Sequence, residues 1–107
     1  MKVIKIIIAE SSPIISGGLS SFFNDMNQIA VASIVDNIDD LQDKIIMHSP
    51  DVLIINPMML GCMLNTFVKQ MTQNYPNTNR VALVSSYVDK NILKNFKEVI
   101  ELSDNKQ

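Results

Sequence analysis

The sequence predicts an α/β fold with a doubly wound parallel sheet, and two observations lead to this prediction. Short apolar runs rich in valine and isoleucine alternate with stretches in which apolar residues recur at helical spacing. Strands that are covered by helices on both faces are typically continuous apolar runs, rather than alternations of apolar and polar residues. Five such runs separated by four helical stretches indicate a five-stranded parallel sheet with helices on both faces.

The apolar runs are too short to be buried helices, and we predict that each is a strand. The first run carries Lys5 and lacks the small-residue cleavage site of a signal peptide, which favours a strand there too. The predicted strands cover Lys5 to Ala9, Ile29 to Val35, Val52 to Ile55, Val81 to Val84 and Val99 to Leu102.

The first helix is expected to begin at Pro13, with Ser12 as its N-cap. Gly17 and Gly18 fall inside this helix, where each costs about 1 kcal/mol relative to alanine. We interpret them as a sign that the helix approaches the sheet closely. The apolar face of this helix is predicted to consist of Ile15, Leu19, Phe22, Phe23 and Met26.

The second helix is predicted from Asp39 to His48 and the third from Met63 to Asn74. Ser49 and Pro50 end the second helix, because the residue before a proline disfavours helical geometry. A short fourth helix is expected to hold Val88, Ile92, Leu93 and Phe96, and Ser103 to Gln107 have the pattern of an N-cap and first turn of a fifth helix that is missing or truncated. Such an ending would leave an apolar face of the sheet open.

Composition indicates one soluble globular domain, since the 107 residues carry a formal net charge of -2 and are 47% hydrophobic. The sequence contains no run of ~18 apolar residues, so we expect no membrane span. A single cysteine, Cys62, cannot form an internal disulfide, so we expect a cytoplasmic protein. The lysines and arginines are scattered, which argues against nucleic-acid binding by this chain itself.

In an open parallel sheet, a binding or reactive site lies beyond the carboxyl ends of the strands. The polar residues at these places are Glu10, Ser11 and Ser12 after the first strand, Asn56 after the third, and Ser85 and Ser86 after the fourth.

Three segments, taken in order, resemble the receiver domain of bacterial response regulators, and most of all the receivers of NarL/LuxR-type transcription factors. They are Ala9-Glu10-Ser11-Ser12-Pro13, Ser49-Pro50-Asp51-Val52-Leu53-Ile54-Ile55-Asn56 and Val81-Ala82-Leu83-Val84-Ser85. The resemblance extends from Lys2 to Leu102. It implies a flavodoxin-like sheet with strand order 2-1-3-4-5 and a place in two-component signal transduction.

The resemblance also implies a phosphorylation site, from which this sequence departs. An intact receiver uses an aspartate as phosphoacceptor and an acidic pair to hold Mg²⁺, because a hard cation prefers oxygen ligands. Glu10 matches the first acidic position and Ser85 the hydroxyl position, but Ser11 replaces the second acid and Asn56 replaces the phosphoacceptor. The family's lysine is also missing after the fifth strand, and Leu60 replaces a proline of the loop.

Other chemistry-bearing residues have simpler interpretations. Cys62 is expected to be a small buried or half-buried residue, and His48 to complement the helix dipole at the end of the second helix. Asp36, Asp39, Asp40 and Asp43 are expected to be a solvated, capped helix start rather than a metal cluster. Methionines around the third helix are expected to pack adaptably, or to form an exposed apolar lip that binds a protein. The candidates for such an interaction are Met58, Met59, Leu60 and Tyr87.

The sequence therefore predicts a degenerate pseudo-receiver with no catalytic residues, no metal, no cofactor and no enzymatic activity. We expect it to be the regulatory domain of a transcription factor, acting through a protein partner or a homodimer, with a DNA-binding helix-turn-helix domain beyond Gln107. The alternative hypothesis is a flavodoxin-like domain that binds a small molecule in the cleft at the carboxyl ends of the strands.

Overall fold

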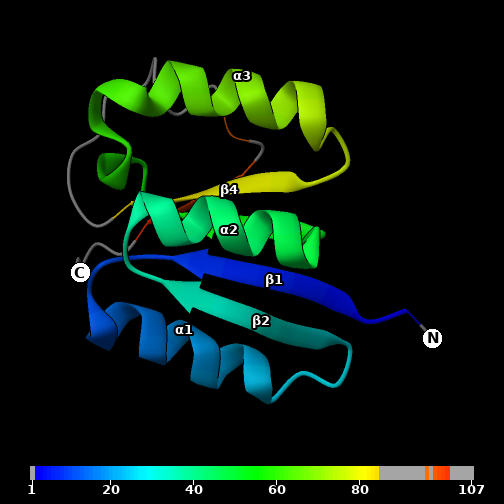
Figure 1. The fold of residues 1–107 in the computed structure, drawn as a ribbon. Coiled ribbons are helices and arrows are strands. Elements are labelled where there is room, and N and C mark those ends of the chain that lie inside the picture. Colours follow the sequence, from blue (N-terminus) through cyan, green and yellow to red (C-terminus); the bar gives the residue numbers. More distant parts are fainter. Residues whose placement is uncertain (1, 85–95, 97, 102–107) are drawn as a thin grey trace.

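The computed structural model describes residues 2–84, 96 and 98–101, which form strands and helices in alternation (Figure 1). The strands are β1 (Ile4–Ala9), β2 (Ile29–Val35), β3 (Val52–Ile55), β4 (Asn79–Val84) and β5 (Glu98–Glu101). The α-helices are α1 (Pro13–Asn24), α2 (Ile38–His48) and α3 (Leu64–Asn74), and two single-turn 3₁₀ helices, η1 (Pro57–Met59) and η2 (Gly61–Met63), precede α3. The predicted strands begin and end within one or two residues of these positions.

The strands form one parallel sheet in the order β2-β1-β3-β4-β5. Ala9, the last residue of β1, is in register with Val35 at the end of β2 and with Ile55 at the end of β3. The α/β class and the parallel sheet are as the sequence predicts. The register brings the carboxyl ends of β2, β1 and β3 to one edge, where the segments after these strands meet.

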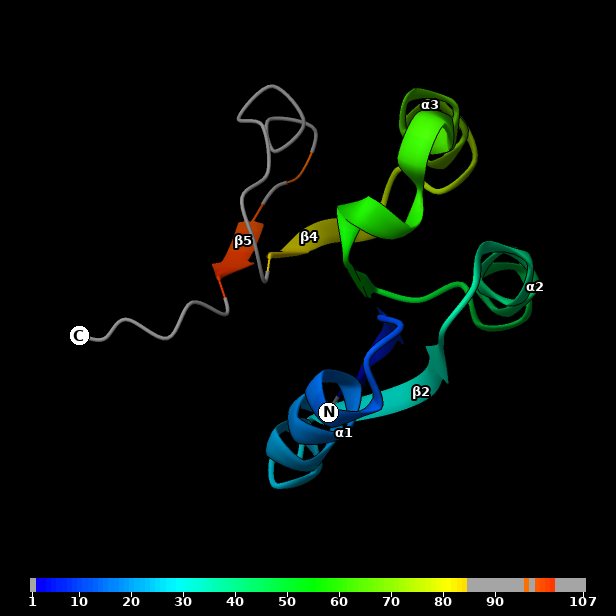
Figure 2. The ribbon, with the colours of Figure 1, turned by 90° about the vertical axis from the view of Figure 1, so that its left-hand side faces the viewer.

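Helices cover the two faces of the sheet unequally: α2 and α3 lie on one face, and α1 lies on the other (Figure 2). Successive side chains of a strand point to opposite faces, so Ile7 is buried beneath α2 and α3 while Ile6 and Ile8 are buried on the α1 side. Burial on both sides explains why the strands are apolar without alternation.

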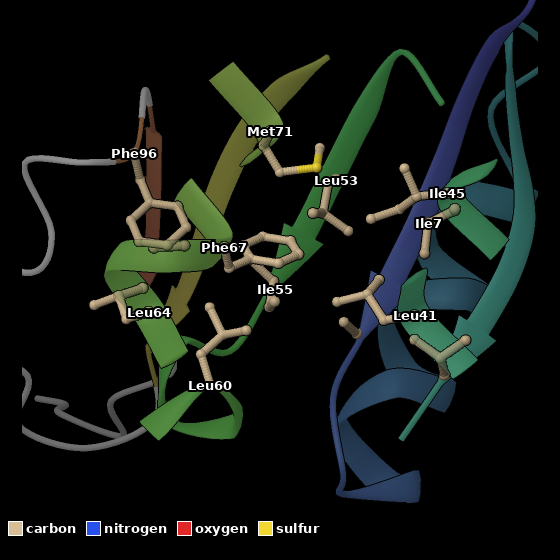
Figure 3. Close-up of a cluster of buried hydrophobic side chains, with 13 residues drawn as sticks. Ile7, Leu41, Ile45, Leu53, Ile55, Leu60, Leu64, Phe67, Met71 and Phe96 are labelled. Carbon is tan, nitrogen blue, oxygen red and sulfur yellow. The ribbon is translucent and has the colours of Figure 1, made fainter. Parts of the chain in front are cut away.

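The larger hydrophobic cluster lies between the sheet and the α2–α3 layer (Figure 3). Phe67 and Met71 of α3 point toward Leu53 and Ile55 of β3, and Leu41 of α2 lies beside Ile7. Burying one such side chain fully contributes roughly 1.5–3 kcal/mol, so this cluster is a main source of stability.

Helix α1 begins as the sequence predicts but faces the sheet with fewer residues. The Ser12 hydroxyl accepts a hydrogen bond from the Ile15 backbone N–H at 3.4 Å, which caps the helix. Ile15, Leu19 and Phe23 pack against the sheet. Phe22 and Met26 are exposed, and so the prediction that they belong to the inward face is wrong. Successive helix residues are about 100° apart, and the rotation of α1 turns Phe23 toward the sheet and Phe22 away from it.

The interpretation of Gly17 and Gly18 is also corrected. Both glycines are exposed, and a Cβ added at either position would meet no atom within 4 Å. They do not mark a close approach of α1 to the sheet.

Helix α2 is capped at both ends. Asn37 Oδ1 accepts a hydrogen bond from the Asp40 N–H at 2.9 Å, while its Nδ2 donates to the carboxylates of Asp36 and Asp40. These exposed acids therefore form the capped helix start that the sequence predicts. At the other end, His48 lies in the last turn and Ser49 adopts the left-handed conformation with φ 45°.

Several predicted features lie outside the described residues. Of the predicted fourth helix, only Phe96 is described, and it is buried in the larger cluster; Val88, Ile92 and Leu93 are not. The predicted fifth helix at 103–107 is also outside. In the part of the chain that is described, no helix is long and apolar enough to cross a membrane.

Candidate functional site

The candidate site lies at the sheet edge where β1 and β3 end side by side. Glu10 follows β1 and Asn56 follows β3. Backbone hydrogen bonds hold both positions: the Glu10 N–H donates to Val35 O at 3.0 Å, and the Asn56 N–H donates to Ala9 O at 3.0 Å. The sheet therefore fixes the backbone positions of Glu10 and Asn56.

Glu10 is a buried carboxylate, only 3% exposed, whose oxygens are occupied by donors of the chain itself. Its Oε2 accepts hydrogen bonds from the Ser12 N–H at 2.8 Å and from the Ser11 hydroxyl at 3.4 Å. Its Oε1 accepts one from Asn56 Nδ2 at 3.0 Å. A buried charge needs such partners, and here the chain supplies them.

Asn56 uses both ends of its side-chain amide. Nδ2 donates to Glu10, and Oδ1 accepts from the Met58 N–H at 3.0 Å, which caps η1. Turning the amide over would place oxygen against the carboxylate and nitrogen against an N–H, so only one orientation suits both partners. An aspartate in this place could accept from Met58 but could not donate to Glu10.

Few side chains that could hold a metal ion are described at this edge of the sheet. Ser11 is exposed and supplies a hydroxyl where the resemblance predicts a second carboxylate. Within the described residues, no group of three His, Cys, Asp or Glu side chains is placed to hold a metal ion. Glu10 is therefore the one carboxylate that faces Asn56 through a hydrogen bond in this part of the structure.

A cleft of about 260 Å³ opens beside Glu10, between the start of α1 and the end of β2. The sequence pattern does not predict this cleft, because it indicates a capped helix start for Asp36 and Asp40 and does not show that they lie beside Glu10. Both carboxylates line the cleft, together with Glu10, Ser11 and Ser16. The cleft is therefore acidic and hydroxyl-lined.

The interaction candidates in the loop after Asn56 differ in how exposed their side chains are. Met58 is 61% exposed, Met59 is half-buried against the larger cluster, and Leu60 is buried in it. Cys62 is exposed, which corrects the expectation that it is buried or half-buried. The short 3₁₀ turns η1 and η2 place it on the outside of the loop.

Ser85 and Tyr87 lie outside the described residues, as does Leu102, after which the resemblance predicts the missing lysine. The backbone of Glu101 pairs with Val84, so β4 and β5 end beside each other.

Comparison with solved structures identifies the class of fold. Neither a protein-family model nor a curated protein matches the chain. The isolated receiver domain of RcsB from Salmonella enterica serovar Typhimurium superposes with a TM-score of 0.80 at 17% identity, covering 94% of this chain and 78% of that one. The receiver domain of the response regulator NarL from Mycobacterium tuberculosis gives 0.78 at 14% identity, with 94% and 85% covered.

RcsB solved as two dimers on two parallel DNAs gives a TM-score of 0.82 at 17% identity, with 94% of this chain and 56% of that chain covered. The chain thus spans little more than half the length of the DNA-bound RcsB chains. At these identities the comparison shows the fold: the chain has the fold of response-regulator receiver domains.

Proposed function

We propose that this chain is a phosphorylation-independent, receiver-like regulatory domain that acts through protein–protein contacts and is not an enzyme. The Asn56–Glu10 hydrogen bond is the observation that carries this proposal. Aspartyl phosphorylation needs a carboxylate nucleophile and a hard cation. Asn56 offers a neutral amide, and the Glu10 carboxylate is already held by three donors.

The site is therefore stabilised in one arrangement by the chain itself. In a two-state regulator, a ligand acts by binding one arrangement better than the other. If no phosphoryl group binds here, a protein partner or a second copy would be the ligand that favours one arrangement over the other. Met58, exposed two residues after Asn56, belongs to the surface that such a partner would contact.

We further propose that DNA is reached only through an output domain beyond Gln107, in the cytoplasm. The support is the resemblance to NarL/LuxR-type regulators and the structural likeness to RcsB, which is solved as dimers on DNA.

The alternative, a small-molecule binder, has the cleft beside Glu10 in its favour. At about 260 Å³ the cleft lies just below the range of typical ligand pockets. Among the described residues that line it, three are acids and none is lysine or arginine, which disfavours a phosphate-bearing flavin. An absorbance spectrum of the purified protein tests the flavin case, since a bound flavin absorbs visible light.

The decisive experiment is incubation with acetyl phosphate and Mg²⁺, followed by the mass of the intact protein. A phosphorylatable receiver in the same buffer is the positive control. We expect no added phosphoryl mass and no stable beryllofluoride adduct. A phosphoryl group mapped to any residue of the Glu10–Asn56 pocket would overturn the proposal.

A further inference from the structure

A groove runs between α2 and α3, the two helices that cover the same face of the sheet (Figure 2). Its volume is about 300 Å³, at the lower end of the range for pockets that hold small molecules. Neither Glu10 nor Asn56 lines it, so it is separate from the site at the carboxyl ends of the strands. We call it the α2–α3 groove.

The floor of the α2–α3 groove is apolar. Phe67 and Met71, one turn apart on α3, line it from one side, and Ile45 of α2 lines it from the other. All three belong to the larger hydrophobic cluster and are only 2% to 4% exposed (Figure 3). Ile46 and Tyr75 add to the apolar lining. A molecule in the groove would therefore lie directly against the hydrophobic core, with an aromatic ring among its contacts.

Three carboxamides border this floor. Gln70 and Asn74 are four residues apart on α3, so they lie on the same side of the helix, and Gln42 lies on α2. All three side chains are exposed, and within residues 2–84 none of these amides is hydrogen-bonded to another residue. A carboxamide offers both donors and an acceptor. A ligand with a donor and an acceptor on one edge can therefore pair with such an amide through two hydrogen bonds.

The α2–α3 groove also lacks charge. Of the described residues that line it, none is acidic or basic, whereas three acids line the cleft beside Glu10. An ionised group placed against an apolar floor loses hydration, and here no opposite charge offsets that cost. The groove therefore selects an uncharged ligand.

The size of the groove favours a small molecule over a segment of another protein. At about 30 Å³ for each water-sized group, it holds roughly ten non-hydrogen atoms, enough for one aromatic ring with a polar substituent. A protein partner needs about 800 Å² on each side for a stable contact. The groove by itself has room for only one side chain of such a partner.

We propose that the α2–α3 groove binds a small uncharged aromatic molecule that carries a carboxamide or a similar edge with a donor and an acceptor. The ring lies over Phe67 and Met71, and the polar edge pairs with the amide of Gln70. This inference goes beyond the proposed function, because the groove is separate from the Glu10–Asn56 pocket. A groove that binds nothing would leave the phosphorylation experiment and its interpretation unchanged.

Benzamide is the probe, because it joins one aromatic ring to an uncharged carboxamide. Titration into the isotope-labelled 107-residue chain, followed by NMR, should shift the signals of α3 and the side-chain amide signals of Gln42 and Gln70. We expect saturation with a Kd between roughly 0.1 mM and 10 mM, as is usual for a molecule of this size. Shifts that do not saturate, or that map to residues outside α2 and α3, would overturn the proposal.

Benzoate is the matched ligand control, since it has the shape of benzamide but carries a negative charge. Its Kd should be at least about tenfold higher than that of benzamide. Equal affinity for the two molecules would contradict the selection of an uncharged ligand.

Gln70→Lys tests the position of the polar edge, because it places an ammonium where the amide stood. The ratio of the benzoate Kd to the benzamide Kd should fall at least about tenfold in this variant, since the carboxylate gains an opposite charge. Gln73→Lys is the matched control, because Gln73 is exposed on the same helix but does not line the groove. It should change the ratio by less than about twofold, since an exposed charge is screened by salt. An equal change of the ratio in both variants, or in neither, would show that the ligand does not lie beside Gln70.

Discussion

The side-chain nitrogen of Asn56 lies 3.0 Å from Oε1 of the buried Glu10 carboxylate. This bond joins the ends of two neighbouring strands across the place where the resemblance predicts an aspartate and a metal ion. Its loss or replacement is therefore the most informative change to the site.

Asn56→Asp should destabilise the fold and should not restore phosphorylation at the rate of an intact receiver. The change removes the donor to Glu10 and sets a second carboxylate beside a buried one, at an expected cost of about 1–3 kcal/mol. It returns the nucleophile without a carboxylate at Ser11, and groups that act as one catalytic unit recover little when one is repaired. Urea unfolding and labelling by acetyl phosphate measure the two effects.

Asn56→Ala is the control, because it removes the donor without adding charge. A pair of carboxylates in contact cannot both ionise easily, so one pKa of the pair in the variant is raised in the folded state above its unfolded value. Stability of Asn56→Asp should therefore be lost as pH rises through that pKa, whereas the alanine variant should lack this trend. Rapid labelling of Asn56→Asp would show that the serine at position 11 matters little.

Gly17→Ala should stabilise the monomer by about 0.5–1 kcal/mol. Position 17 is helical and open, so the added methyl meets no atom within 4 Å. Gly61→Ala is the control, because Gly61 has φ +53° and equally open surroundings. An alanine there must adopt a left-handed conformation, which costs roughly 1–2 kcal/mol. Thermal unfolding at low protein concentration should show opposite signs, and a destabilised Gly17→Ala would mean that the helix needs this glycine.

Leu60→Ala should cost about 2–5 kcal/mol, while Met58→Ala should change stability by less than about 0.5 kcal/mol. Leu60 is buried in the larger cluster, and Met58 is exposed two residues earlier in the same loop. If Met58 belongs to a partner surface, Met58→Ala should weaken association without changing the urea midpoint. Similar destabilisation by both substitutions would contradict the finding that Leu60 is buried and Met58 is exposed.

The strands and their parallel arrangement could be predicted because burial on both faces leaves an unbroken apolar run. Val52–Ile55 is such a run, and the structure places it between β1 and β4. Helix caps could be predicted equally well. Ser12 before Pro13 indicates a helix start in the sequence, and Ser12 is the N-cap of α1 in the structure. These signals depend only on residues that are close together in the sequence, so they can be recognised without the structure.

The features that could not be predicted depend on contacts between distant segments. The sequence shows an asparagine at position 56, but the bond to Glu10 requires the register of β1 with β3. Phe22 and Phe23 are both aromatic, and only the rotation of α1 on the sheet decides that Phe23 packs and Phe22 does not. Cys62 is exposed because of the 3₁₀ turns, which hydrophobic periodicity does not reveal.

Asp51 should make the fold sensitive to acid. Its carboxylate accepts a hydrogen bond from the Lys5 backbone N–H at 2.9 Å, and this bond, with help from the Lys2 ammonium, lowers the pKa of Asp51 below its ordinary value of 3.8. A group whose folded pKa is lowered stabilises the fold above its unfolded pKa, and this contribution is lost as pH falls through the folded value. We therefore expect stability to decline below about pH 4.

Asp51→Asn tests this expectation, since the amide oxygen still reaches the Lys5 N–H but carries no charge. Urea unfolding of the wild-type chain and of this variant should differ most near pH 7, and the difference should shrink below about pH 4. Lys2→Ala should have a small effect, because the 3.6 Å ion pair involves a lysine side chain that is 79% exposed. If Lys2→Ala removed as much of the pH dependence as Asp51→Asn, the ion pair rather than the backbone hydrogen bond would be the main cause.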